Sequence, residues 1–484
     1  MVSDELLRRW ADLTHRLSPL RERLAPIHRR LPLEAIRERA AILVGAILLG
    51  LVGLLFAKLA DGAQSLFRNV VRSSEWLPFL VTPAMFVAVV WVTRRFFPAA
   101  QGSGIPQVIA TIDSSRGGIR KSLVSLRVGL AKIGLTLLVL LGGGAAGREG
   151  PTVQVSAAIM ASVHERFRVR LSSSILIAGG AAGIAAAFNT PLAGIAFAIE
   201  ELASSYAQKV TIMIMGAVMI AGMVSLGLAG DYVYFGRTSE TLGLLQTITI
   251  APVVGIVGGI AGGLFARLLL AHSAGKARWA QLLKARPLVT ALSCGLFVAA
   301  LGYLTDGLSF GTGYHGTRAL LAGETVSPLF GPGKLLAALA TTFSGAPGGI
   351  FAPSLSVGAG LGQLVAMLFP SASMAAVVLL GMTAYFTGVV RAPFTAVIIL
   401  SEATGNHGAI LSMFAAALIA DACSAWVCPT RLYHGLARAF LRKSDRPGEQ
   451  PGPEPAPALP VGNADHSPTE MYDVRQGRDP GDPA

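Results

Sequence analysis

The stretch Gly147-Arg148-Glu149-Gly150-Pro151 places two charged residues inside a long apolar, glycine-rich part of the chain. Charged side chains at membrane depth are costly and usually mark an ion or proton pathway. Glycines followed by a proline are typical of a helix start, because a proline in the first turn loses no needed hydrogen bond. The free N–H groups of a helix start attract anions. The stretch therefore predicts an anion site with the Glu149 carboxylate beside it.

The composition indicates an integral membrane protein. Of the 484 residues, 52% are hydrophobic and 14% are charged, and the mean hydropathy is +0.59. A soluble domain has about a quarter charged residues. The net charge of +13 is better explained by basic residues that flank membrane spans than by binding of nucleic acid. These flanks predict two cytoplasmic termini and an even number of crossings; they are the basic N-terminal segment, Arg94-Arg95, Arg438, Arg442 and Lys443.

Apolar runs recur from about residue 41 to about residue 430. The first run, Ala41–Ala57, is expected to insert as the first span, and Ile175–Ile199 is expected to form one helix. Many of the runs are shorter than the roughly 20 residues that span a bilayer, and 56 glycines and 27 prolines interrupt the chain. Short, broken helices are typical of transporters. Close packing of helices is expected at the glycines of Gly255–Gly263.

An internal repeat runs through this region. Gly102–Gly104 matches Gly311–Gly313 at an offset of 209 positions. Duplicated halves with broken helices indicate a transporter whose site lies at the repeat interface, although the residues alone leave open whether the repeat is inverted. The pairs at a constant offset of 202 positions are Gly147 and Gly349, Pro151 and Pro353, Val155 and Val357, Ala157 and Ala359, Gly179 and Gly381, Ala182 and Ala384, Pro191 and Pro393, and Glu200 and Glu402.

The repeat divides the chain into five segments. We expect a basic cytoplasmic N-terminal segment (1–40), a first membrane repeat (41–230), a linker (231–246) and a second membrane repeat (247–440). The last segment (441–484) is acidic and proline-rich, and its composition predicts a disordered cytoplasmic tail.

Three further features support an anion site. Gly102-Ser103-Gly104-Ile105-Pro106 and Gly348–Pro353 also place glycine before proline. The hydroxyl of Ser103 or of Tyr433 could donate a hydrogen bond to an anion. A simple helix-breaking turn is the alternative for any one segment, but three segments, two of them related by the repeat, favour the anion site.

The acidic residues separate into two groups. Glu149 resembles an anion when it is ionised and would leave the site when protonated, so it can couple proton and anion occupancy; a structural pair with Arg148 is the alternative. Glu200 recurs as Glu402, which favours a structural role. The unmatched Glu201 is the better candidate for a proton pathway, although both acids could simply mark the helix end at the aqueous boundary.

No enzyme signature is present in the sequence. There is no Ser-His-Asp order, HExxH motif or phosphate loop, and the histidines and the three cysteines show no metal-ligand spacing. We therefore expect no enzymatic activity, no cofactor and no metal.

Together, the segments at 102–106, 147–151 and 349–353 and the late Tyr433 resemble those of the CLC family of chloride channels and chloride/proton antiporters. The resemblance covers about residues 40–440 and is closest to the prokaryotic type, which lacks cytoplasmic regulatory domains. It implies an all-α membrane protein, built as a homodimer from inverted repeats of tilted and broken helices, with one pore per subunit. One departure is Arg431, since the family often has proline two residues before the tyrosine.

The resemblance also implies roles for particular residues. Ser103, Tyr433 and the backbone amides of Ile350 and Phe351 would coordinate the anion, and Ser103 matches the chloride-preferring version. Glu149 would be the external gate and Glu201 the internal proton glutamate. The supporting residues would be Gly102, Gly104, Gly147, Arg148, Gly150 and Gly349.

The sequence thus favours a proton-coupled chloride antiporter of the cell (inner) membrane, with chloride, protons, lipid and a second copy of the chain as partners, and no nucleic acid. The alternative is a passive voltage- or pH-gated chloride channel of the same fold. A receptor or scaffold that has lost transport is disfavoured, because Ser103, Glu149 and Tyr433 are all present.

Overall fold

The computed structural model describes residues 33–114, 122–203, 212–230 and 233–444, and the expectations for the N-terminal segment before residue 33 and for the tail after Ser444 lie outside the described residues. The described chain is helical, with two isolated β-bridges. The helices of its first half are α2 (Leu33–Ser73), α3 (Pro78–Phe96), η1 (Pro98–Ala100), α4 (Ile105–Asp113), α6 (Leu126–Leu141), α7 (Glu149–Arg166), α8 (Ser173–Phe188), α9 (Pro191–Phe197), η2 (Ala198–Leu202) and α10 (Ile212–Ala229).

The second half repeats this order. Its helices are α11 (Leu244–Ala274), α12 (Arg278–Ala285), α13 (Pro287–Leu304), α14 (Tyr314–Leu321), α15 (Phe330–Phe343), α16 (Phe351–Ala366), α17 (Met374–Val390), α18 (Pro393–Thr404), α19 (Ile410–Val427) and α20 (Leu432–Ser444). Helices α7 and α16 begin 202 positions apart, as do α9 and α18, and α4 and α14 begin 209 positions apart. These are the offsets read from the sequence, so the repeated residues occupy equivalent places in repeated helices.

Five of the described helices are long and apolar enough to cross a membrane. They are Ile36–Ser73, Pro78–Phe96, Leu244–Ala274, Pro287–Leu304 and Ile410–Val427. The expected first span, Ala41–Ala57, lies inside the first of them. Several other apolar helices have 10–17 residues, which is shorter than the roughly 20 residues of a full span. The expectation of short, broken helices is confirmed.

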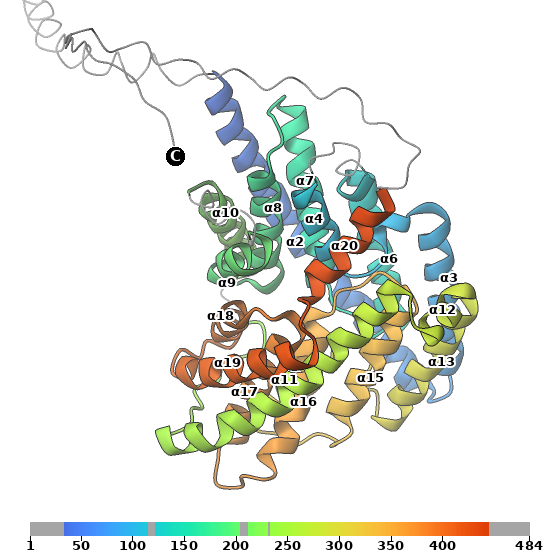
Figure 1. Cartoon of the computed structure of the whole chain (residues 1–484), viewed down its shortest axis with the longest axis vertical. Coiled ribbons are helices and arrows are strands. Elements are labelled where there is room, and N and C mark those ends of the chain that lie inside the picture. Colours follow the sequence, from blue (N-terminus) through green and yellow to red (C-terminus); the bar gives the residue numbers. More distant parts are fainter. Residues whose placement is uncertain (1–32, 115–121, 204–211, 231–232, 445–484) are drawn as a thin grey trace, which may run out of the picture. The chain divides into compact units, whose positions relative to one another are not determined.

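The two halves are related by a rotation that exchanges them. Gly147 and Gly349, which are equivalent residues, donate backbone hydrogen bonds to each other as an antiparallel bridge. Helices α7 and α16 both begin at this bridge and run away from it in opposite directions, which Figure 1 shows as α7 in its upper part and α16 in its lower part. The repeat is therefore inverted, which the sequence alone left open.

One predicted helix is wrong. The run Ile175–Ile199 was expected to be continuous, but α8 ends at Phe188 and α9 begins at Pro191. Asn189 between them adopts a left-handed conformation (φ 58°). The next residue, Thr190, precedes Pro191, and a residue before a proline is disfavoured in a helix. The break lets α9 begin with N–H groups that are not used within α8.

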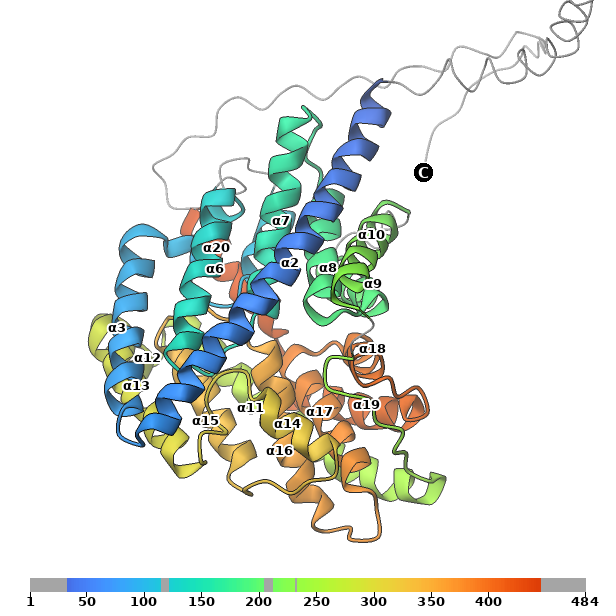
Figure 2. The ribbon, with the colours of Figure 1, turned by 180° about the vertical axis from the view of Figure 1, so that it is seen from behind.

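Glycines permit the closest helix contacts, as expected for Gly255–Gly263. A Cβ atom on Gly258 would lie 2.7 Å from the backbone nitrogen of Tyr385 in α17, and one on Gly259 would lie 2.5 Å from the carbonyl oxygen of Ala420 in α19. Helix α11 therefore packs directly against the backbones of α17 and α19. Figure 2 shows these three helices together in the part of the molecule that the second half occupies.

Candidate anion and proton site

Each of the three glycine–proline segments begins a helix. Helix α4 follows Gly104, α7 begins at Glu149 and α16 begins at Phe351. No side chain caps these helix starts, so the first N–H groups of each helix are available to a ligand or to another part of the chain. The three predicted helix starts are confirmed.

Backbone contacts bring the three helix starts together. Gly147 N–H donates to the Gly349 carbonyl at 2.7 Å, and Gly349 N–H donates back at 2.8 Å. Gly348 N–H donates to the Gly102 carbonyl at 3.1 Å. A Cβ atom on Gly349 would lie 3.0 Å from both the Gly147 oxygen and the Gly150 nitrogen. Glycine is needed because the backbones themselves are in contact.

The loop before α4 also requires glycine. Gly102 and Gly104 have φ angles of 72° and 109°, in a region that side chains disfavour. A Cβ atom on Gly104 would lie 2.7 Å from the Gly150 carbonyl oxygen. These two glycines hold Ser103 between the starts of α4 and α7.

Ser103 and Tyr433 meet in this region from opposite ends of the sequence. Both side chains are buried, and Tyr433 is fully enclosed near the start of α20. The two hydroxyls lie close enough to interact, yet neither makes a hydrogen bond of normal geometry within the described chain. Buried hydroxyls are nearly always hydrogen-bonded in native proteins. Two unsatisfied donors that face one another fit a site for an anion.

The start of α16 completes the same surroundings. Phe351 is the first residue of α16, and Ile350 directly precedes this helix. Ile350 and Ser103 line one cavity. The Phe351 ring lies 5.9 Å from the Tyr433 ring and 4.7 Å from the Phe386 ring. The start of α16 therefore packs its first side chain against Tyr433, and Ile350 lines the same cavity as Ser103.

Glu149 is the first residue of α7 and is fully buried. Its Oε1 accepts a hydrogen bond from the Tyr234 hydroxyl at 3.2 Å. The backbone N–H of Ala352, in the first turn of α16, also faces the carboxylate. The carboxylate thus lies where the helix starts of both halves converge, and exposed N–H groups at a helix start attract negative charge.

Arg148 acts electrostatically on Glu149, and its hydrogen bonds also reach another helix. It donates to the Ala57 carbonyl at 2.6 Å and to Asp61 at 2.8 Å, both on α2. Its guanidinium lies 5.6 Å from the centre of the Tyr234 ring. Arg148 therefore attaches the start of α7 to α2.

Glu201 lies in a different environment. It belongs to the π-helical turn η2, is fully buried, and approaches His434 Nδ1 at 3.5 Å. Its neighbour Glu200 has different contacts: the Glu200 carboxylate accepts hydrogen bonds from N–H groups at the start of α18. Both Glu201 and Glu149 lie near enough to Tyr433 to interact with it electrostatically. The two predicted acids are thus both buried, and both interact electrostatically with the Tyr433 hydroxyl.

Glu200 and Glu402 form a reciprocal clasp between the halves. Glu200 accepts hydrogen bonds from the N–H groups of Phe394 and Thr395 at the start of α18, at 3.3 and 2.7 Å. Glu402, on α18, accepts those of Leu192 and Ala193 at the start of α9, at 3.2 and 2.7 Å. The expected structural role of the repeated carboxylate is confirmed, since each caps the helix of the other half.

Arg431, the departure from the family pattern, contributes to this arrangement. Its guanidinium donates to the Glu200 carbonyl at 3.3 Å. Helix α20 begins at the next residue, Leu432, and carries Tyr433 inward. Arginine here ties the start of α20 to η2, and the tyrosine still reaches Ser103.

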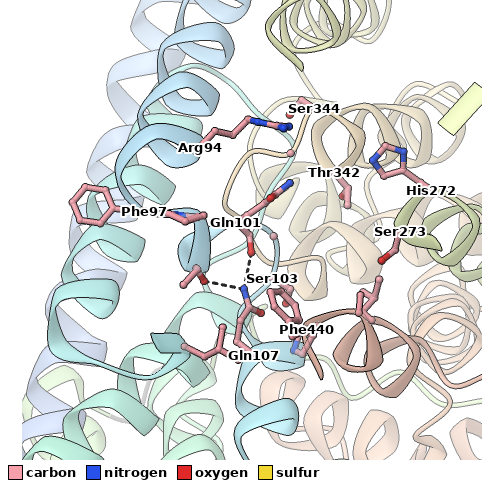
Figure 3. Close-up of a pocket in the computed structure, with 18 of the residues that line it drawn as sticks. Arg94, Phe97, Gln101, Ser103, Gln107, His272, Ser273, Thr342, Ser344 and Phe440 are labelled. Carbon is pink, nitrogen blue, oxygen red and sulfur yellow. Dashed lines mark hydrogen bonds between the residues drawn. The ribbon is translucent and has the colours of Figure 1, made fainter. Parts of the chain in front are cut away.

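A cavity of about 880 Å³ opens on the other side of Ser103. Figure 3 shows Ser103 and Gln107 with Phe440 on one side, and Arg94 and Ser344 on the other. Arg94, Arg127 and Lys284 give its wall positive charge. Burial lowers the pKa of Lys284, which donates to the Ser273 carbonyl at 2.7 Å. The wall of the cavity that Ser103 lines therefore carries basic side chains.

Four contacts at the site escaped the sequence analysis. Tyr234 and His434 touch the two acids, and Asp61 holds Arg148. Buried Lys132 donates to the carbonyls of Ala100, at 2.8 Å, and Gly102. The repeat could have revealed this lysine, because Lys334 stands 202 positions later and donates to the carbonyls of Ser309, Phe310 and Gly311. No sequence signal marks Tyr234.

Paired helix starts, buried hydroxyls and two buried acids in an apolar helical bundle define an ion-transporting membrane protein. The model of the voltage gated chloride channel family matches residues 84–425. The chain therefore belongs to this family, the CLC transporters, which are membrane proteins and not enzymes.

Solved structures share the fold. A slow cyanobacterial Cl⁻/H⁺ antiporter is 24% identical with a TM-score of 0.72, over 85% of this chain and 99% of that one. A CLC-type fluoride/proton antiporter is 23% identical with a TM-score of 0.70, over 84% and 99% of the two chains. A eukaryotic CLC transporter is 21% identical with a TM-score of 0.67, over 84% and 75%. The all-α fold of inverted repeats is thus the fold expected from the sequence.

Proposed function

We propose that this protein is an antiporter that moves chloride across the membrane in exchange for protons. The observation that carries the proposal is the pair of fully buried acids, Glu149 and Glu201, which both act on Tyr433, whose buried hydroxyl, like that of Ser103, has no hydrogen bond of normal geometry within the described chain. A passive anion pathway has no need of two buried carboxylates, each of which is expensive to keep.

In this proposal chloride binds between the Ser103 and Tyr433 hydroxyls, with the amides of Ile350 and Phe351 as further donors. These are neutral donors, and they attract an anion without the strong binding that a full positive charge would cause. Lys132 has an indirect part: it occupies the carbonyls of Ala100 and Gly102, which would otherwise repel the anion. The chemistry of the donors fits chloride.

Glu149 acts as the gate. The ionised carboxylate occupies the place between the starts of α7 and α16 and excludes an anion from it. Protonation removes the charge, weakens its attraction to the N–H groups and lets chloride take its place. Each exchange of the ionised Glu149 carboxylate for chloride therefore binds one proton, and the reverse exchange releases it.

Glu201 receives protons from the other side. His434 Nδ1 lies 3.5 Å from its carboxylate and is partly exposed, so this side chain connects the buried acid to the water-accessible surface. Since Glu201 lies away from the cavity wall, protons and chloride enter by separate routes and meet near Tyr433.

The experiment is transport by the purified protein in liposomes. An inward chloride gradient is expected to drive protons out against their own gradient. Glu149→Gln is expected to abolish proton movement, and Glu201→Gln is expected to retain chloride flux while losing proton flux. Chloride flux without proton movement in the wild type would instead identify a passive channel, and retained coupling in Glu201→Gln would remove that residue from the pathway.

We propose that two copies of the chain form a homodimer through α9, α10, α18 and α19, which pack together at one side. This side exposes large apolar residues, among them Leu192, Met223, Leu411 and Trp426. Both termini are proposed to be cytoplasmic, in the inner membrane. Cross-linking of Leu411→Cys in native membranes tests the dimer, and accessibility of a C-terminal tag tests the orientation.

A further inference from the structure

Tyr234 lies in the connection between α10 and α11, outside every segment that the family resemblance covers by motif. Its side chain is buried, and its hydroxyl donates to Glu149 Oε1 at 3.2 Å. This hydrogen bond joins the phenol directly to the proposed gate. A phenol donates strongly to a carboxylate and only weakly to a neutral carboxylic acid, because hydrogen bonds to charged groups are the stronger ones.

Surrounding rings fix the orientation of the phenol. The Tyr234 ring makes edge contacts with the rings of Phe188, Phe235 and Tyr314, at centroid distances of 5.2, 4.8 and 5.6 Å. The Arg148 guanidinium lies over it at 5.6 Å. Phe188 ends α8, Arg148 precedes α7 and Tyr314 begins α14, so the ring is held by elements of both halves.

The backbone around Tyr234 is also anchored. Phe235 N–H donates to the Ala403 carbonyl at 2.9 Å, and Thr238 N–H donates to the Thr404 carbonyl at 3.1 Å, at the end of α18. Adjacent to these carbonyls is Glu402 of the clasp. The connection therefore cannot carry Tyr234 away from the site without breaking its attachment to α18.

Other groups act on Glu149 from the remaining sides. Arg148 directly precedes α7 and is paired with Asp61 of α2. The Ala352 N–H comes from α16, and Tyr433 comes from α20. The Tyr433 hydroxyl interacts with Ser103, whereas the Tyr234 hydroxyl donates to Glu149. Tyr234 is thus the neutral side chain whose donor is committed to the carboxylate.

We propose that Tyr234 is a positioning residue that holds the ionised Glu149 carboxylate in the place of an anion and releases it when the carboxylate is protonated. The inference rests on the proposed gating role of Glu149. It predicts that the phenol sets the acidity at which the gate opens. Removal of the donor weakens the ionised, blocking form, so that protonation and opening occur at higher pH.

The test compares the pH dependence of chloride efflux from liposomes for the wild type and Tyr234→Phe, which keeps the ring and removes only the donor. The midpoint of acid activation is expected to move upward by about one pH unit, the effect of losing one hydrogen bond to a charged group. Tyr314→Phe is the matched control, because it removes a hydroxyl from the same ring cluster with no contact to Glu149. Its profile is expected to match the wild type.

The double variant Glu149→Gln/Tyr234→Phe is expected to behave like Glu149→Gln, because the phenol acts through the carboxylate. A midpoint in Tyr234→Phe equal to that of the wild type, or an equal shift in Tyr314→Phe, would overturn the inference. A different result would refute the proposed antiport: chloride movement without proton movement in the wild-type protein. In that case the efflux profile still tests Tyr234, since it needs no proton measurement.

Discussion

Glu402→Gln is expected to destabilise the protein while leaving proton coupling intact. Glutamine keeps the length of the side chain and one acceptor oxygen, but it replaces the second oxygen with an NH₂ group. The N–H groups of Leu192 and Ala193, at 3.2 and 2.7 Å, would then share one acceptor. The helix start of α9 also loses the negative charge that stabilises it.

The magnitude follows from these contacts. A hydrogen bond to a charged group contributes about 1.5–3 kcal/mol, and a charge at a helix start contributes about 0.3–1 kcal/mol. Glu402 is partly exposed, and solvent screening favours the lower end of these ranges. We therefore expect a loss of about 2 kcal/mol in the free energy of unfolding.

The assay is thermal unfolding in detergent, followed by circular dichroism, together with proton-coupled chloride flux in liposomes. Glu324→Gln is the matched control, because Glu324 is exposed and the same chemical change there should leave the unfolding midpoint unchanged. Glu201→Gln should show the opposite pattern, with coupling lost and stability retained. An unfolding midpoint of Glu402→Gln equal to that of the wild type would refute the assignment of the repeated carboxylates to the clasp.

Three further predictions concern the anion site and its entrance. Gly349→Ala is expected to lower the free energy of unfolding by about 1–3 kcal/mol, because the added Cβ would press on the Gly147 backbone. The yield of folded protein on size-exclusion chromatography should fall accordingly, and a normal yield and unfolding midpoint would contradict this. Tyr433→Phe is expected to weaken chloride binding about tenfold in calorimetry, the effect of one hydrogen bond to an anion, and unchanged affinity would exclude the hydroxyl as a ligand. Because burial lowers the pKa of Lys284, this lysine loses its charge sooner than an exposed one as the pH rises. Anion entry from its side should therefore decline at alkaline pH, and Lys284→Arg should retain entry there; an identical alkaline decline in both proteins would refute the role of Lys284.

The sequence was most informative where chemistry is local to a motif. Glycine followed by proline restricts the backbone within a few residues, so the starts of α4, α7 and α16 could be predicted without knowledge of the fold. The Ile175–Ile199 run shows the limit of this reasoning. Its apolar composition is continuous, and only the left-handed Asn189 and the N–H groups of α9 that Glu402 caps reveal why the helix breaks.

The repeat was the second strong source of information. A constant offset separated the duplicated Glu200 from the unmatched Glu201, and the structure gives the first a capping role in each half. The offset could not show direction in space, because a residue pair at equivalent positions is compatible with either a parallel or an inverted arrangement. The antiparallel Gly147–Gly349 bridge decided that.

The sequence by itself determined that Gly147–Pro151 is a helix start with an acid in a membrane protein, because composition and backbone restriction are properties of neighbouring residues. Only the tertiary structure decided which groups surround that acid. Arg148, its neighbour in sequence, is held by Asp61 of α2, whereas Tyr234, 85 positions away, donates to Glu149. Contacts of this kind depend on how distant helices pack, and no local pattern encodes them.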